Sequence, residues 1–157
     1  MASTSAGLLL FRRTAAGVEV LLGHMGGPLW ARRDAGAWTV PKGEHTPDEP
    51  AHDAALREFS EELGLPAPPG RGADLDLGEV RQRGGKVVRS WAREADLDPA
   101  DVVPGTFEME WPPRSGRRVR FPELDRVRWV PLADAGALVV SAQAELLARL
   151  AAALAQP

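Results

Sequence analysis

Hydrophobic residues lie along the chain in short blocks, separated by polar, Gly-rich and Pro-rich stretches. The continuous apolar blocks at 5–12 and 18–22 predict two buried strands. Over 106–111 every second residue is apolar, which predicts a strand with one polar face. Further extended segments are predicted over 38–41, 77–82, 86–93 and 126–130, with a hairpin turn at Gly84-Gly85.

Over residues 50–63 the apolar spacing changes to the period of a helix. Asp48 or Glu49 is expected to cap the start of this helix, and Pro50 suits its first turn. Gly64 is expected to end it, because glycine adopts the left-handed conformation that commonly closes a helix.

Two more helices are predicted near the C-terminus. A short one covers 132–138, and an Ala- and Leu-rich one covers 141–155 with Ser141 as its cap. The segment 112–120 is basic and contains Gly and Pro, so it is expected to be a loop. This order of elements indicates an α+β or α/β/α domain with a mixed sheet.

Composition narrows the class of protein. With 157 residues, 44% of them hydrophobic, the chain fits a single globular domain over 1–157. The absence of Cys excludes disulfides, thiolate metal sites and cysteine nucleophiles. A net charge of −3 argues against a nucleic acid duplex or a membrane as partner. Residues 1–10 lack the basic start of a secretory signal, so a cytoplasmic location is expected.

The candidate catalytic and metal-binding residues are concentrated in the helix at 50–63. Glu58, Glu61 and Glu62 are three and four residues apart, so they share one face of that helix. Such a face is most often merely solvated. A cluster of carboxylate oxygens is also what hard divalent cations bind. The three histidines (His24, His45 and His52) have no spacing typical of metal ligands and are expected at the surface.

The residues around this cluster decide between the two interpretations. They reproduce the pattern G-x5-E-x7-R-E-U-x-E-E-x-G-U, in which U is a bulky aliphatic residue, with Phe59 as a mild departure. The fixed positions are Gly43, Glu49, Arg57, Glu58, Glu61, Glu62 and Gly64, and Leu65 ends the pattern. This pattern is the Nudix box, and the chain resembles Nudix hydrolases over most of its length.

The resemblance implies a Nudix-type α/β/α sandwich with a mixed β-sheet. It also implies hydrolysis of the pyrophosphate bond in a nucleoside diphosphate linked to another group, with Mg²⁺ or Mn²⁺ as cofactor. By position, Glu58, Glu61 and Glu62 would bind the metal, one of them being a candidate general base. Gly43 would offer its carbonyl oxygen to the metal, and Glu49 would pair with Arg57. Arg57 would thereby orient the catalytic carboxylates, and Gly64 would support the box.

A fourth carboxylate ligand is expected near the last strand. Nudix enzymes often add one from a loop that precedes that strand, and Glu123 is best placed for it. Glu108 and Glu110, on the strand with one polar face, are the alternatives.

The basic residues are candidates for binding the substrate. Lys42 directly precedes the box and would neutralise a phosphate group. Lys86 beside the hairpin turn would act likewise, unless it is simply solvated. Arg114 and Arg118 belong to the basic loop, which suits either additional phosphates or a disordered tip.

The substrate class is narrowed by what the chain lacks. It has neither the proline that marks ADP-ribose hydrolases nor the tyrosine that marks many diadenosine polyphosphate hydrolases. A small-molecule nucleoside triphosphate or dinucleoside polyphosphate is therefore expected. The alternatives are a diphosphoinositol-type pyrophosphate hydrolase and a nucleotide-binding Nudix regulator without turnover. Because family members are often dimers, a homodimer is expected by analogy.

Overall fold

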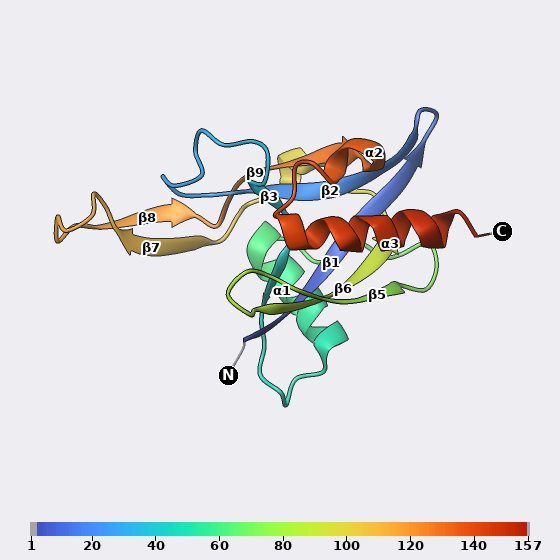
Figure 1. The fold of residues 1–157 in the computed structure, drawn as a ribbon, viewed down its shortest axis with the longest axis horizontal. Helices are drawn as coiled ribbons and strands as arrows, with labels where there is room; N and C mark the ends of the chain where they lie inside the picture. Colours follow the sequence, from blue (N-terminus) through green and yellow to red (C-terminus); the bar gives the residue numbers. More distant parts are fainter. Residues whose placement is uncertain (1–2, 157) are drawn as a thin grey trace.

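The computed structural model describes residues 3–156, which form a mixed sheet with helices on both faces and a projecting hairpin (Figure 1). The seven strands of the main sheet are β1 (Thr4–Thr14), β2 (Gly17–Met25), β3 (Trp38–Thr39), β4 (Lys42–Glu44), β5 (Leu75–Arg81), β6 (Val87–Glu94) and β9 (Leu124–Pro131). The α-helices are α1 (Ala51–Leu63), α2 (Leu132–Ala135) and α3 (Ala144–Leu154), and the 3₁₀ helices are Pro99–Asp101 and Ser141–Gln143. Strands β7 (Thr106–Glu110) and β8 (Arg118–Pro122) form the hairpin.

The main sheet runs in the order β3-β2-β1-β6-β5, with β4 also paired to β1 and β9 to β2. Strand β1 is parallel to β6, and the other pairs are antiparallel. The sheet is therefore mixed, which confirms the predicted fold class.

The central strand β1 is buried on both faces, as its continuous apolar run predicts. Leu8 and Leu10 pack into one hydrophobic cluster together with Phe59 of α1. The alternate residue Leu9 packs into a second cluster that contains Leu146 of α3. Because neighbouring residues of a strand point to opposite faces, α1 and α3 cover opposite sides of the sheet. The layers are those of an α/β/α sandwich.

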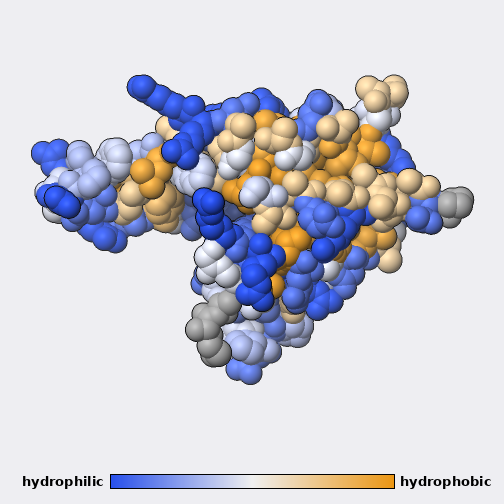
Figure 2. Space-filling model, in the orientation of Figure 1, coloured by the Kyte–Doolittle hydropathy of each residue, from blue (hydrophilic) through white to orange (hydrophobic). Residues whose placement is uncertain are grey.

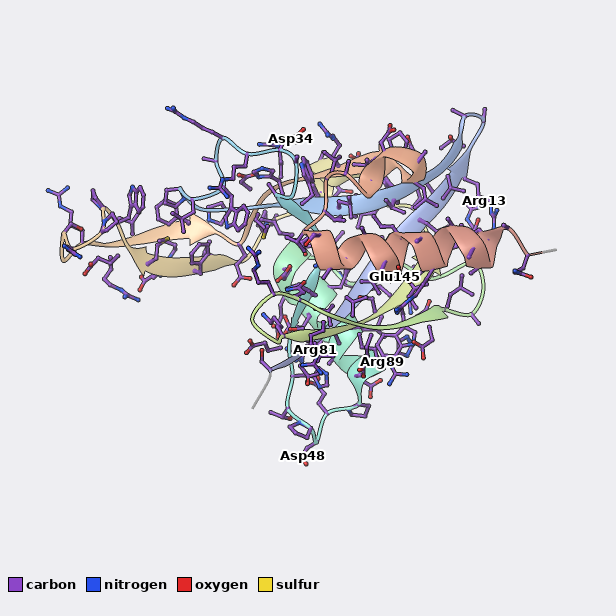
Figure 3. The ribbon with its side chains drawn as sticks, viewed as in Figure 1. Arg13, Asp34, Asp48, Arg81, Arg89 and Glu145 are labelled. Atoms are coloured by element: carbon purple, nitrogen blue, oxygen red, sulfur yellow. The ribbon has the colours of Figure 1, made fainter. Side chains whose placement is uncertain are left out.

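The ends of the helices differ from the prediction. Neither Asp48 nor Glu49 caps α1; Pro50 takes the cap position without a side-chain hydrogen bond. Asp48 instead lies at the tip of the loop before the helix (Figure 3). Ser141 starts the 3₁₀ helix that precedes α3, and its side chain does not cap it. Gly64 does close α1 in the left-handed conformation, at φ 71°.

The hairpin corrects the prediction of a loop over 112–120, because β8 begins at Arg118 inside that segment. Strands β7 and β8 pair only with each other in the described chain, and they project from the body together with the turn between them (Figure 1). We call residues 106–122 the arm. Phe107 and Phe121 pack together at its base, with ring centroids 6.1 Å apart.

Hydrophobic side chains gather along α3 on the face seen in Figure 2, whereas the far end of the arm is hydrophilic.

No helix within residues 3–156 is long and apolar enough to cross a membrane.

Candidate active site

The loop from β4 to α1 brings the two halves of the box together. Strand β4 pairs with β1, which places Gly43 opposite Ala6 on the side of the sheet that α1 covers. The carboxylate of Glu58 occupies the space in which a Cβ atom of residue 43 would lie. A side chain at position 43 would therefore have to displace the carboxylate of Glu58.

Arg57 connects this loop to the helix. Its Nε and Nη2 atoms donate to the two oxygens of Glu49, both at 2.8 Å. Its Nη1 atom donates to Glu58 at 2.9 Å and to Glu61 at 3.2 Å. These charge-assisted bonds raise the pKa of Arg57 and lower the pKa of Glu49. One guanidinium thus holds three acidic side chains of the box in place.

Glu62 lies on the inner side of the carboxylate cluster. Burial raises the pKa of Glu62 to about 8, and repulsion from Glu123 adds to this effect, while Lys42 opposes it. Burial lowers the pKa of Lys42, which also lies near the charge of Lys86. Glu58 is affected in the same direction as Glu62, since burial raises its pKa as well. Burial and the neighbouring carboxylates therefore disfavour the charged forms of Glu58 and Glu62.

These groups meet at a cleft. Its walls include Lys42, Glu62 and Glu123, together with Gln82 and Gln143. The structure thus brings Glu123 to the cluster, while Glu108 and Glu110 lie on β7 in the arm. The two glutamines were missed by the sequence reasoning. A polar residue at the start of an otherwise Ala- and Leu-rich helix was the available signal for Gln143.

The donor atoms of the carboxylate cluster determine which metal ion the site could hold. Within residues 3–156, no three His, Asp or Glu side chains are already arranged so that they could bind one metal ion together. Glu58 and Glu61 are instead bonded to Arg57. The site offers carboxylate oxygens, which are the ligands of hard divalent cations. The raised pKa values of Glu58 and Glu62 also show that their ionised forms are disfavoured, and a bound cation would stabilise those forms. By donor type and by charge, the residues fit such an ion.

The basic candidates separate into two groups. Lys86 lies beside the box, with its Nζ atom 3.5 Å from a carboxylate oxygen of Glu44. Arg114 lies in the turn of the arm, and Arg118 lies at the start of β8. The structure therefore places Lys42 and Lys86 near the carboxylates, and carries the two arginines out on the arm (Figure 1).

His24 corrects the prediction of three surface histidines. Its side chain is fully buried in the sheet, and its ring packs edge-on against Trp38 at 5.1 Å. Burial is tolerated because both ring nitrogens have partners: Nδ1 lies 2.9 Å from Asp125, and Nε2 lies 2.6 Å from the carbonyl oxygen of Arg33. His45 and His52 are partly exposed.

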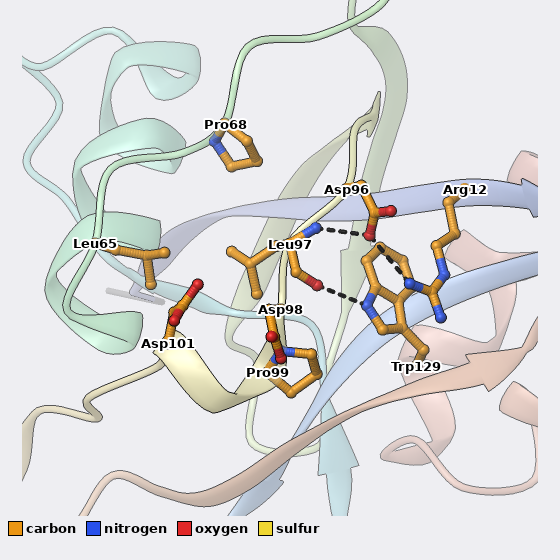
Figure 4. Close-up of a pocket in the computed structure, with 9 residues that line it drawn as sticks. All are labelled: Arg12, Leu65, Pro68, Asp96, Leu97, Asp98, Pro99, Asp101 and Trp129. Atoms are coloured by element: carbon orange, nitrogen blue, oxygen red, sulfur yellow. Dashed lines mark hydrogen bonds and ion pairs between the residues drawn. The ribbon is translucent and has the colours of Figure 1, made fainter.

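A larger open hollow, of about 610 Å³, lies beyond the C-terminal end of α1 (Figure 4). The guanidinium of Arg12 stacks over Trp129 there, 4.3 Å from the ring centroid. Asp96, Asp98 and Asp101 supply its negative charge, and none of the box carboxylates lines it. The hollow is therefore separate from the cleft that contains Glu62.

Comparison with known proteins identifies the class. A family model described as NUDIX domain matches residues 2–150. The chain belongs to the Nudix hydrolase family, whose members generally depend on a divalent metal.

The proteins that resemble this chain include enzymes with different activities. The RNA pyrophosphohydrolase of Pseudomonas putida is 47% identical over 47 residues, a match that covers 29% of this chain and only 30% of that protein. The C. elegans Ap4A hydrolase, solved as a binary complex, has 26% identity and a TM-score of 0.66, and the match covers 98% of both chains. A Nudix hydrolase from M. smegmatis has 25% identity and a TM-score of 0.61, covering 98% of this chain and 86% of its own.

Proposed function

We propose that this protein hydrolyses a pyrophosphate bond in a substrate built on a nucleoside diphosphate, with a divalent metal ion as cofactor. The observation that carries the proposal is that Glu62 and Glu123 line one cleft together with Lys42. Glu58 lies close enough to Glu62 that its charge adds to the effect of burial and raises the pKa of Glu62. Carboxylates that bind a cation and a lysine that binds phosphate are complementary to a metal-bound polyphosphate.

The box residues would hold the metal. Glu58, Glu61 and Glu62 would supply carboxylate oxygens, Gly43 its carbonyl oxygen, and Glu123 a further carboxylate. Bound there, the ion would supply charge neutralisation and activation of a water molecule. We propose Mg²⁺, with Mn²⁺ as the alternative.

The remaining residues position these groups and the substrate. Arg57, fixed by Glu49, sets the direction of Glu58 and Glu61. One carboxylate of the box would also take the proton of the attacking water as general base. Lys42 and Lys86 would neutralise phosphate oxygens that the carboxylates repel. Arg114 and Arg118 would contribute only where the substrate extends along the arm.

For the substrate we propose a dinucleoside polyphosphate or a nucleoside triphosphate. The likeness to the C. elegans Ap4A hydrolase along nearly the whole chain supports the former, although this chain lacks tyrosine. The RNA pyrophosphohydrolases of Pseudomonas add RNA as a further candidate substrate. We further propose that the protein acts in the cytoplasm as a homodimer, by analogy with the family.

The deciding experiment measures release of phosphate and pyrophosphate with Mg²⁺, with Mn²⁺ and with EDTA. The panel contains nucleoside triphosphates, dinucleoside polyphosphates, 5′-triphosphorylated RNA and diphosphoinositol phosphates. Turnover of a nucleotide that EDTA abolishes is the expected result. Glu62→Gln should lower kcat by about 10²-fold or more while the protein stays folded.

Other outcomes would reject the proposal in different ways. Turnover of inositol pyrophosphates alone would assign the diphosphoinositol-type activity. Nucleotide binding without turnover across the panel would indicate a regulator. Full activity of Glu62→Gln would remove this carboxylate from the mechanism.

A further inference from the structure

Gln143 is a fully buried polar side chain directly before α3, and it joins three segments around the cleft. Its Oε1 atom accepts a hydrogen bond from the backbone N–H of Val40 at 2.9 Å. Its Nε2 atom donates to Oγ1 of Thr39 and to Oε1 of Gln82, both at 3.0 Å. All of these partners come from distant parts of the chain, so the contacts are a product of the fold.

The direction of every bond in this network is fixed by chemistry. A backbone N–H can only donate, so Val40 must face the oxygen of the Gln143 amide. The nitrogen of that amide must then face Thr39 and Gln82. The hydroxyl of Thr39 donates to the carbonyl oxygen of Val40 at 3.0 Å, so its oxygen is free to accept from Gln143. Gln82 therefore has to present its own oxygen to Gln143.

The nitrogen of the Gln82 amide has no partner in this network. Gln82 lines the same cleft as Lys42 and Glu62. Its backbone is held at the end of β5, where its N–H donates to Lys86 at 2.7 Å and its carbonyl accepts from Gly85 at 3.0 Å. No hydrogen bond among residues 3–156 uses its Nε2 atom. The cleft thus contains an oriented amide that offers two N–H donors, while its oxygen already accepts a hydrogen bond from Gln143.

We propose that Gln82 is a specificity-determining residue, which donates a hydrogen bond to an unprotonated acceptor atom of the substrate. Gln143 is the positioning residue, because it fixes the orientation of the Gln82 amide. This inference rests on the proposed function. The acceptor is either a carbonyl oxygen or ring nitrogen of a nucleobase, or an oxygen of a phosphate group. A substrate group that offers only donors at this point is disfavoured, because its N–H would face the N–H of Gln82.

Gln82→Glu is one test, because it keeps the shape and the oxygen that Gln143 needs but replaces the two donors by a negatively charged oxygen. We expect KM to rise about tenfold with kcat nearly unchanged, on the preferred nucleotide of the wild-type protein. Gln82→Met removes donor and acceptor without adding charge, and should raise KM similarly. Gln156→Glu, the same chemical change at an exposed residue, is the matched control and should behave as wild type.

Gln143→Glu tests the positioning role. A carboxylate cannot donate to Thr39 and Gln82, so the Gln82 amide becomes free to rotate. KM should rise in this variant too. In a protein that already carries Gln82→Met, adding Gln143→Glu should raise KM no further. A merely structural Gln143 would instead lower the melting temperature and raise KM equally in both backgrounds.

Ribose 5′-triphosphate, which has no base, separates the two kinds of acceptor. If the Gln82→Met effect on KM disappears with this substrate, the acceptor is on the base; if it persists, the acceptor is a phosphate oxygen. A wild-type KM in both Gln82 variants would overturn the inference. Wild-type protein without turnover on any substrate would instead reject the proposed function, so the two failures are distinguishable.

Discussion

Gly43 shows how one residue without a side chain defines the carboxylate cluster. A Cβ atom at this position would overlap the carboxylate of Glu58, which Arg57 also holds from the other side. Gly43→Ala should therefore displace Glu58 and lower kcat by about 10²-fold, because a misplaced carboxylate no longer serves the reacting groups. Steady-state kinetics on the preferred substrate checks this.

The control for Gly43→Ala is Gly72→Ala. Nothing lies within 4 Å of a Cβ atom at residue 72. The control should keep the kcat of the wild type. Unchanged kcat in Gly43→Ala would mean that Glu58 has no fixed position in the reaction.

At the scale of elements, α1 has to be rigid because it carries three box carboxylates. Phe59 anchors it: the side chain is fully buried in the cluster between α1 and the sheet. Phe59→Ala should lower the free energy of unfolding by about 3–5 kcal/mol, since it leaves a cavity that the surroundings fill only in part. Urea unfolding measures the loss.

Leu29→Ala is the matched control, because Leu29 is 61% exposed. Its free energy of unfolding should change by less than about 0.5 kcal/mol. A small effect of Phe59→Ala, similar to that of the control, would show that α1 does not depend on this contact.

Helix α1 and the box could be predicted from the sequence because their signals are local. The apolar period, Gly64 and the spacing of the glutamates all lie within one continuous segment. Strand β8 and the buried His24 could not, because their partners are distant: β8 is defined by its pairing with β7, and His24 by Asp125. Gln143 was missed for the same reason, since its bonds to Val40 and Gln82 exist only after folding.

At the scale of the whole molecule, Asp74 connects α1 to the sheet. Its carboxylate accepts two hydrogen bonds from Arg93 at 2.8 Å and lies 2.7 Å from Nε2 of His52. Burial acts to raise the pKa of Asp74, but the bonds from Arg93 and His52 outweigh it and hold that pKa below its usual value. The folded state therefore favours the ionised carboxylate.

The sign of the pH dependence follows from this shift. A carboxylate whose pKa is lower in the folded state contributes stability above its unfolded pKa, near 4, and loses it as pH falls through the folded value. Asp74→Asn should be less stable than wild type by about 1–3 kcal/mol at pH 7, and the difference should shrink towards pH 3. Urea unfolding at both pH values measures it. Asp134→Asn, at an exposed residue, should show no such difference, and a constant gap for Asp74→Asn would contradict the linkage.

The arm raises the question of how far a substrate extends from the cleft. Glu123, which lines the cleft, follows directly after the arm, whereas Arg114 lies out in its turn (Figure 1). A nucleoside triphosphate bound at the carboxylates should therefore not reach the turn, but a 5′-triphosphorylated oligonucleotide that leaves the cleft past Glu123 should. Arg114→Gln combined with Arg118→Gln should leave KM for the triphosphate within about twofold of wild type. For the oligonucleotide, KM should rise several-fold at low salt and converge on the wild-type value as salt screens the phosphates.

The matched control for this double variant is Arg71→Gln, which removes an exposed arginine outside the arm. It should change neither KM. Equal increases for the triphosphate and the oligonucleotide would mean that the arm closes over the cleft and binds the phosphates themselves. No increase for either substrate would remove both arginines from substrate binding. An increase for the oligonucleotide alone would mean that the charge of the arm acts only on phosphates that pass beyond the reach of Lys42.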